Sequence, residues 1–339
     1  MASSPPPDGP PQGVVAIGAS AGGVEALTRL ASGLPSDLPF ALLVVLHVPA
    51  SAPSVLAKII DRSGPLPAES AANGAPLERG RIHVAIPDRH LLVSDHRLLV
   101  SEGPTESGYR PAINTLFRSV ALEFGPRAIG VLLSGVLDDG VAGLGAIQAR
   151  GGTTLVQRPD DALYPAMPHN AIAAGVADHQ VTAADVGEVL KRLAGREIKE
   201  RSMEPDISME LENRIAMGTR FEVSIGGDTL GPPSGYTCPD CNGSLMTLSD
   251  TSYRCRVGHA WTADALLKAR DDEVEGAIWV ALRSLKEKAN LARRLAQKVG
   301  TGMLYQRYNE AADEADQAMT VLGKRLLESS ADSDNPDGG

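Results

Sequence analysis

Between residues 14 and 23 the sequence reads VVAIGASAGG. Its first four residues are apolar, which is typical of a buried strand, and the small residues that follow allow a tight turn. A helical pattern begins at Val24, so Ser20 is expected between a strand and a helix, the context of a nucleophilic serine in G-x-S-x-G. The same residues fit a structural turn with a solvated serine, or a dinucleotide loop in which serine replaces the second glycine.

Two further apolar runs also lead into polar residues. Residues 41–46 end at His47, and residues 129–133 lead through a short loop to Asp139. The carboxyl ends of parallel strands lie along one rim of a sheet, so we expect the three polar side chains to meet there. Together they have the composition of a hydrolytic triad, with Ser20 as nucleophile, His47 as base and Asp139 as orienting carboxylate. The alternative for the third residue is structural: Asp138 or Asp139 could cap the helix expected at 141–150. A histidine at position 47, where a dinucleotide site would carry an acidic residue, argues against that site.

Strand and helix patterns alternate over residues 13–194. This predicts an α/β fold with a doubly wound, mostly parallel sheet and helices on both faces. Further strands are expected at 81–86 and 153–157, a hairpin at 91–94 and 97–100, and helices at 24–30, 54–60, 112–124, 141–150 and 184–193.

The bulk composition bounds the class of protein. The chain has 339 residues, enough for two domains, and its net charge of −10 argues against a nucleic-acid partner. Its longest apolar run, residues 40–46, is too short for membrane insertion, and the amino-terminal residues lack the features of a signal peptide, so a cytoplasmic location is expected. Residues 1–12 and 329–339 are expected to be disordered tails, and residues 195–235 a linker.

Three cysteines and a histidine form the pattern C-x2-C-x13-C-x3-H. They are Cys238, Cys241, Cys255 and His259. Such spacing predicts a small zinc-ribbon-like module over residues 236–262, with a closed tetrahedral shell and therefore a structural zinc ion. The alternative is three buried free cysteines and a surface histidine. Two apolar stripes at helical spacing, broken at residues 300–302, predict an αα-hairpin over residues 263–328.

Five blocks of sequence resemble the CheB-type chemotaxis methylesterase family over residues 13–194. They are GASAGG at 18–23, HVP at 47–49, RPAINTLFRS at 110–119, SGVLDDG at 134–140 and YPAMP at 164–168. The resemblance implies a serine hydrolase that removes methyl groups from glutamate γ-methyl esters of chemoreceptors, and that also deamidates receptor glutamines in some members. It needs no catalytic cofactor. By position, Ser20, His47 and Asp139 would be catalytic.

The same resemblance places Ala21, Arg110 and Val136 beside the substrate. Ala21 stands where the family pattern has threonine, and Val136-Leu137 where it has Met-Gly, which leaves rate and substrate choice open. Because only 12 residues precede the first strand, no receiver domain is expected in this chain. The expected partner is a methylated chemoreceptor or a similar signalling protein. A non-catalytic adaptor that keeps the fold, and a hydrolase for another ester or amide, are the alternatives.

Overall fold

The computed structural model describes residues 9–198, 206–218 and 231–333, with side chains to residue 327. The chain divides into two compact units, Met1–Leu266 and Leu267–Gly339, and each is described separately. Of the predicted amino-terminal tail, residues 1–8 lie outside the described residues, whereas the backbone N–H of Gln12 donates to the carbonyl of Pro39 at 2.9 Å.

A seven-stranded sheet forms the centre of the first unit, with the order β3-β4-β2-β1-β7-β8-β9. Its strands are β1 (Val14–Ala19), β2 (Ala41–Leu46), β3 (Ala68–Ser70), β4 (Ile82–Val84), β7 (Ala128–Leu132), β8 (Thr153–Gln157) and β9 (His179–Val181). All neighbouring pairs are parallel. Strand order reverses at β1, which lies between β2 and β7. This confirms the predicted doubly wound α/β architecture.

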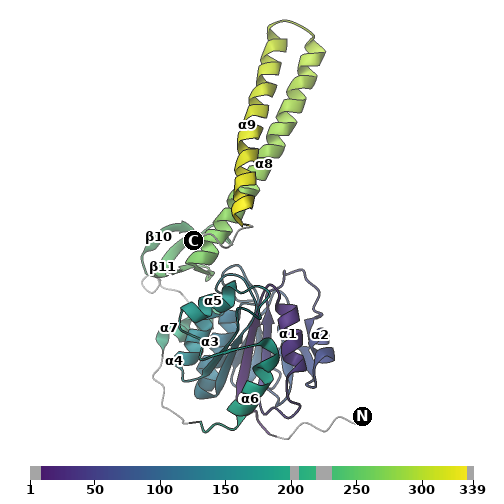
Figure 1. The fold of residues 1–339 in the computed structure, drawn as a ribbon. Helices are drawn as coiled ribbons and strands as arrows, with labels where there is room; N and C mark the ends of the chain where they lie inside the picture. Colours follow the sequence, from purple (N-terminus) through teal and green to yellow (C-terminus); the bar gives the residue numbers. More distant parts are fainter. Residues whose placement is uncertain (1–8, 199–205, 219–230, 334–339) are drawn as a thin grey trace. The chain divides into compact units, whose positions relative to one another are not determined.

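Helices cover both faces of the sheet (Figure 1). They are α1 (Gly23–Ser32), α2 (Leu56–Ser63), α3 (Ile113–Phe124), α4 (Val141–Ala149), α5 (Ala166–Ala173) and α6 (Val186–Ala194). Alternate residues of β1 enter two separate apolar clusters: Val15 and Ile17 pack with α1, α2 and α6, whereas Val14 and Ala16 pack with α3, α4 and α5. A strand buried on both sides is apolar throughout, which is why residues 14–17 could be recognised as a strand from the sequence.

The hairpin of β5 (His90–Ser94) and β6 (Arg97–Ser101) is antiparallel, as expected, and joins the cluster that contains α3. The sequence pattern gave no indication of β3, β9 or α5. The two strands have only three residues each and lie at the sheet edges, where exposed polar side chains hide the strand signal.

Part of the predicted linker is helical. Helix α7 (Ile207–Ala216) lies within residues 195–235 and belongs to the first unit, where its Ile215 and Ala216 are buried. The Asp206 side chain caps it by accepting from the backbone N–H of Met209 at 2.9 Å, and Ser101 Oγ donates to the Ala216 carbonyl at 2.6 Å. The helix presents only a narrow apolar face, which explains why periodicity did not reveal it. Residues 199–205 and 219–230 of the linker lie outside the described residues.

The Cys/His segment forms a four-stranded antiparallel sheet within the first unit. Its strands are β10 (Pro233–Thr237), β11 (Ser244–Ser249), β12 (Ser252–Cys255) and β13 (Ala260–Thr262). We refer to residues 233–262 as the Cys/His module.

The second unit is a helical hairpin. It is built from α8 (Ala263–Val299), which begins in the first unit, and α9 (Met303–Ser333). Small side chains hold the two helices together at Ala289, Ala292, Ala312 and Ala315, and Arg293 forms an ion pair with Asp316. Helix α9 runs into the predicted carboxyl-terminal tail as far as Ser333; residues 334–339 lie outside the described residues. Among the residues that the structure describes, no helix is both long and apolar enough to cross a lipid bilayer.

Candidate active site

Three neighbouring strands deliver the three predicted catalytic residues to one edge of the sheet. Ser20 directly follows β1, His47 directly follows β2, and Asp139 lies in the loop that joins β7 to α4. Because β2, β1 and β7 are adjacent and parallel, these positions lie side by side at the carboxyl ends of the strands. This is also where the strand order reverses, the usual place for a ligand site in a doubly wound sheet.

The side chains of these residues form one hydrogen-bonded chain. His47 Nδ1 lies 3.1 Å from Ser20 Oγ, and His47 Nε2 lies 2.7 Å from Asp139 Oδ2. The histidine and aspartate side chains are only 4% and 3% exposed. With the ring proton on Nε2 the imidazole donates to the carboxylate, which leaves Nδ1 free to accept the serine proton. The arrangement is that of a nucleophile, a base and an orienting carboxylate.

Backbone donors hold the Asp139 carboxylate at the start of α3. Its Oδ2 accepts from the N–H of Ile113 at 2.7 Å and its Oδ1 from the N–H of Asn114 at 3.0 Å. The first N–H groups of a helix have no partner within the helix and lie at the positive end of its dipole, so they stabilise a negative charge. The Asp139 side chain therefore accepts hydrogen bonds from the first turn of α3. The alternative considered from sequence was that it caps α4.

Nothing in the sequence pattern indicated that Asn114 clamps the active-site loop. Its Oδ1 accepts from the backbone N–H groups of Gly140 and Gly143, at 3.0 and 2.7 Å, and so binds the start of α4 to the start of α3. Its place in the RPAINTLFRS block was the available signal.

The turn after Ser20 requires a small residue two positions later. Gly22 has φ of +70°, and a Cβ there would come within 2.7 Å of Ser134 Oγ. That hydroxyl donates to the Ala21 carbonyl at 2.8 Å and accepts from the backbone N–H of Tyr164 at 2.9 Å. Two of the motif blocks are thereby joined to the serine turn through Ser134.

The loop between β7 and α4 contains one strained residue. Leu137 has φ of +60°, in the left-handed region that side chains other than glycine rarely adopt. It stands at the position where the family pattern has glycine. Its neighbour Val136 is 37% exposed.

A groove of about 400 Å³ opens at Ser20 and His47. Arg110 lines it, but its guanidinium is already engaged: Nε and Nη2 donate to Asp88 Oδ1 at 3.0 and 2.5 Å, and Nη1 donates to the Gly103 carbonyl at 3.0 Å. The hydrogen bond from Arg110 is the main cause of the lowered pKa of Asp88. Arg110 thus fixes the wall of the groove, and its contact with substrate stays a prediction.

Tyr109 also lines the groove, and no sequence signal pointed to it. Its ring lies flat against the imidazole of His47, with 3.7 Å between ring centroids and 7° between planes. A stacked aromatic ring restricts the orientation of the imidazole without occupying either nitrogen.

His90 holds the polypeptide on either side of Tyr109. Burial lowers its pKa, which favours the neutral ring. The Pro104 carbonyl lies 2.9 Å from Nε2, and the backbone N–H of Ala112 donates to Nδ1 at 3.3 Å. With its proton on Nε2, His90 therefore satisfies both contacts.

Asp138 takes no part in the hydrogen-bonded chain of Ser20, His47 and Asp139. Its Oδ1 accepts a hydrogen bond of 3.0 Å from the Thr262 hydroxyl of the Cys/His module. Burial raises the pKa of Asp138 to about 6; the nearby charge of Asp139 adds to this rise and the Thr262 hydrogen bond opposes it.

The four predicted metal ligands converge in the Cys/His module. Their ligand atoms all lie within 4.8 Å of one another. Cys241 Sγ lies 3.6 Å from Cys255 Sγ, and His259 Nδ1 lies 3.5 Å from Cys255 Sγ and 3.6 Å from Cys238 Sγ. Zinc–sulfur bonds of about 2.3 Å in a tetrahedron separate the sulfur atoms by roughly 3.7 Å, so the donor set fits a zinc ion.

Burial of this cluster disfavours its charged forms when no cation balances them. It raises the pKa of the Cys238 thiol to about 12 and lowers the pKa of His259. A divalent cation would reverse this preference for the thiols, because metal binding requires and stabilises the thiolate.

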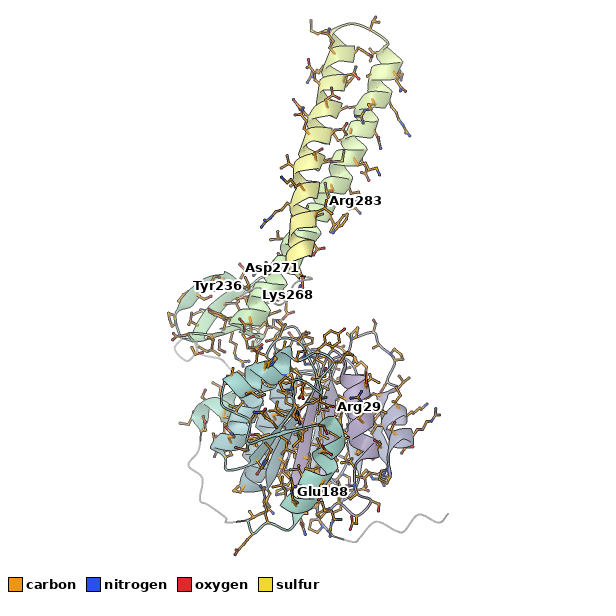
Figure 2. The ribbon with its side chains drawn as sticks, in the orientation of Figure 1. Arg29, Glu188, Tyr236, Lys268, Asp271 and Arg283 are labelled. Carbon is orange, nitrogen blue, oxygen red and sulfur yellow. The ribbon has the colours of Figure 1, made fainter. Side chains whose placement is uncertain are left out.

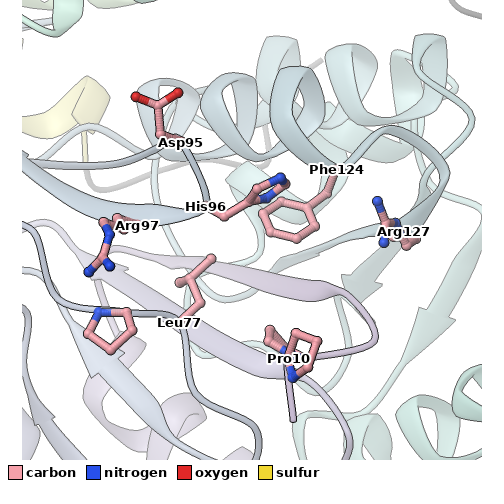
Figure 3. A pocket seen from close by; sticks show the side chains of 9 residues that line it. Pro10, Leu77, Asp95, His96, Arg97, Phe124 and Arg127 are labelled. Atoms are coloured by element: carbon pink, nitrogen blue, oxygen red, sulfur yellow. The ribbon is translucent and has the colours of Figure 1, made fainter.

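A second hollow of about 360 Å³ lies away from these residues. Figure 3 shows Pro10, Leu77, His96 and Phe124 among the side chains that line it. Its lining residues include no serine or cysteine, so they offer no nucleophile equivalent to Ser20. Elsewhere the helices present charge outward; Arg29 on α1 and Glu188 on α6, both labelled in Figure 2, are exposed.

Several known proteins are similar to this chain. The family model described as CheB methylesterase matches residues 15–190, just over half of the chain. A protein-glutamate methylesterase/protein-glutamine glutaminase of Anaeromyxobacter dehalogenans is 43% identical over 183 residues, covering 52% of this chain and 54% of the relative. One of Myxococcus xanthus is 38% identical over 179 residues, covering 52% and 51%. The chain thus spans about half the length of the curated relatives it matches.

A solved structure shares the fold. The CheB methylesterase catalytic domain of Thermotoga maritima is 26% identical, with a TM-score of 0.51, and the match covers 53% of this chain and 98% of that domain. The segment that the family model matches, residues 15–190, contains Ser20, His47 and Asp139. The chain belongs to the CheB methylesterase family.

Proposed function

We propose that this chain is a protein-glutamate methylesterase that hydrolyses γ-methyl esters of glutamate on methylated chemoreceptors or similar signalling proteins. The observation that carries the proposal is the chain of contacts at the groove: 3.1 Å from Ser20 Oγ to His47 Nδ1 and 2.7 Å from His47 Nε2 to Asp139. The curated relatives, whose names give this activity, support it.

Acylation uses His47 first as base and then as acid. Nδ1 takes the Ser20 proton as Oγ bonds to the ester carbonyl carbon, and Asp139 stabilises the imidazolium through Nε2–H. When the tetrahedral intermediate collapses, the bond from carbon to methoxy oxygen breaks and Nδ1–H protonates the departing methanol. Ser20 then carries the glutamyl group as an ester.

Deacylation repeats these steps with water. His47 Nδ1 removes a proton from the attacking water, and Ser20 Oγ leaves with that proton, so that the glutamate carboxylate is released. A glutamine side chain would follow the same path with ammonia as leaving group, which accounts for the second, deamidating activity. No cofactor is needed in any of these steps.

We assign oxyanion stabilisation to backbone N–H groups beside Ser20. Ala21 precedes the first turn of α1, where helix N–H groups favour negative charge. Val136, exposed on the adjacent loop, and Arg110, in the groove wall, are the proposed substrate contacts from the other sides. Alanine at position 21 brings no hydroxyl to this environment.

The Cys/His module is proposed to bind a structural zinc ion through Cys238, Cys241, Cys255 and His259. Four protein ligands fill a tetrahedral shell, so the ion would supply folding free energy to the module and leave no position for substrate.

The test combines active-site labelling with methanol release. A fluorophosphonate probe should label wild-type protein and not Ser20→Ala, and only wild-type protein should release methanol from methylated receptor. Labelling without methanol release would indicate a hydrolase for another ester or amide. Absence of labelling in folded wild-type protein would indicate the adaptor alternative and refute the proposal.

A further inference from the structure

The Cys/His module lies directly on one loop of the groove, residues 105–110. Ala260 of β13 is paired with this loop through two backbone hydrogen bonds: Ser107 N–H donates to the Ala260 carbonyl at 2.7 Å, and Ala260 N–H donates to the Thr105 carbonyl at 3.2 Å. Since backbone contacts of this kind fix the path of a chain, the module determines where the 105–110 loop runs.

Side chains reinforce this pairing on both sides. Thr105 Oγ1 donates to Asp240 Oδ2 at 2.7 Å, and Thr262 Oγ1 donates to Asp138 Oδ1 at 3.0 Å. Asp240 lies between the cysteines of the first ligand pair, and Asp138 directly precedes Asp139. The module therefore contacts two segments that each carry a residue of the active site.

Trp261 covers the loop at Gly108. The tryptophan is 5% exposed, and a Cβ on Gly108 would lie 3.3 Å from its Cη2 atom. Gly108 has φ of +78°, which favours glycine for a second reason. The next residue, Tyr109, stacks on His47 with centroids 3.7 Å apart, so the residue that contacts the module directly precedes the one whose ring lies against the base.

A network of two arginines and two glutamates, in which all members except the partly exposed Glu212 are buried, connects the same parts. Arg118 of α3 is hydrogen-bonded to Glu106 of the loop, and its Nη1 lies 3.0 Å from Glu212 of α7. Glu212 in turn lies 3.6 Å from Arg254 of β12 in the module. Buried ion pairs add little net stability over apolar packing, but loss of one member is costly; the network thus fixes the relative positions of its members.

We propose that the Cys/His module is a positioning element for His47. By holding the 105–110 loop it keeps Tyr109 stacked on the imidazole, so that Nδ1 faces Ser20; Tyr109 and Trp261 are positioning residues in this scheme. The inference rests on the proposed function, because it assigns a role toward the same base. It links the folding of the module to the rate at which the serine is acylated.

The two tryptophans of the chain provide a matched pair of variants. Trp261→Phe keeps a buried aromatic ring but removes Cη2 and Cζ3, the atoms nearest to Gly108. Trp279→Phe makes the same change at a residue that is 59% exposed in the second unit. We expect Trp261→Phe to slow fluorophosphonate labelling of Ser20 about tenfold, since small misplacements of catalytic groups lower rates strongly. Trp279→Phe should label at the wild-type rate, and all three proteins should contain equal metal.

Variants at Tyr109 test the step from the loop to the base. Tyr109→Phe keeps the stacked ring and should label faster than Tyr109→Leu, which should slow labelling about tenfold relative to wild type. If both residues act through His47, the double variant Trp261→Phe/Tyr109→Leu should be no slower than the slower single variant, because the effects share one path. Multiplied effects would overturn the proposed path.

These measurements distinguish failure of the positioning role of the module from failure of the proposed hydrolase function. If Trp261→Phe loses metal, the labelling rate of Thr105→Val tests the positioning role instead. This variant removes only the hydrogen bond to Asp240 and keeps the side-chain shape. Wild-type labelling rates in both Thr105→Val and Trp261→Phe would overturn the positioning role and leave the proposed function intact. A wild-type protein that the probe does not label would refute the proposed function itself.

Discussion

The carboxylate of Asp139 accepts a hydrogen bond from the backbone N–H of Ile113, 2.7 Å from Oδ2, the same oxygen that faces His47. Three donors in all converge on this side chain, which is 3% exposed. Two main-chain N–H groups and the imidazole thus fix the position of the carboxylate.

Asp139→Asn should lower methanol release about 10³-fold or more while leaving a folded protein. An amide offers one acceptor oxygen where the carboxylate offers two, so either the imidazole or a backbone N–H of α3 meets an NH2 group. The measurement is kcat with a methylated receptor. The control is Asp138→Asn, which keeps an acceptor for Thr262 and should retain activity. Equal losses in the two variants would contradict the assignment of Asp139.

Glu106→Gln should lower the free energy of unfolding by about 3 kcal/mol at neutral pH, because it leaves Arg118 buried with one fewer anionic partner. The control is Glu25→Gln, which removes an exposed partner of Arg29 and should cost less than about 1 kcal/mol. Urea unfolding of the three proteins measures both. A loss at position 106 as small as that at position 25 would show that the buried network contributes little.

The same pair has a defined pH dependence. Burial opposes ionisation of Glu106, but the charge and hydrogen bond of Arg118, with the charge of Arg254, lower its pKa from 4.5 to about 2. A lowered folded-state pKa gives stability that is complete above pH 4.5 and is lost as the pH falls toward 2. The difference in unfolding free energy between wild type and Glu106→Gln should be constant from pH 7 to about 5 and shrink below that. A difference that stays constant to pH 3 would contradict the lowered pKa.

Leu137→Gly should be tolerated unusually well. Relief of the left-handed backbone at φ of +60° is worth about 1–2 kcal/mol, which offsets the loss of a half-buried side chain. Leu163→Gly is the control, because Leu163 is exposed and lies outside the positive-φ region, so glycine there costs backbone entropy without relieving strain. Thermal unfolding should rank Leu137→Gly at or above Leu163→Gly, and the reverse order would argue against strain at residue 137.

Purified protein should contain one zinc ion per chain, and Cys238→Ser should contain none. A closed Cys3His shell needs all four ligands, and the module has few apolar residues with which to fold alone. Metal analysis and the visible absorption of the cobalt-substituted protein report on the site directly. Full metal content in Cys238→Ser would exclude the proposed ligand set.

The parts of the fold that were predictable are those in which burial dictates the residue type. Strands β1 and β2 lie inside the sheet, so their sequences are apolar runs whose limits the structure reproduces closely. The meeting of Ser20, His47 and Asp139 was foreseeable because parallel strands share a carboxyl edge. Both inferences need only local sequence and one rule of topology.

Other features depend on contacts between distant segments. The stacking of Tyr109 on His47 and the packing of Trp261 on Gly108 join residues more than 60 and more than 150 positions apart, and both Tyr109 and Gly108 lie in a loop without periodicity. Helix α7 could not be recognised from sequence for a related reason. It is capped by Asp206 and buries Ile215 and Ala216 within the first unit, and only a small part of its surface is apolar.

The main-chain origin of the donors to Asp139 has an evolutionary consequence. If side chains donated these hydrogen bonds, a substitution at any of the donor positions would disturb the carboxylate. Peptide N–H groups are supplied by every amino acid except proline, so the donor to Asp139 does not depend on the side chain at position 113, whose size and polarity are set by its burial in the core. Selection at position 113 can therefore act on packing alone, whereas position 114 must also keep the side-chain oxygen that binds the start of α4.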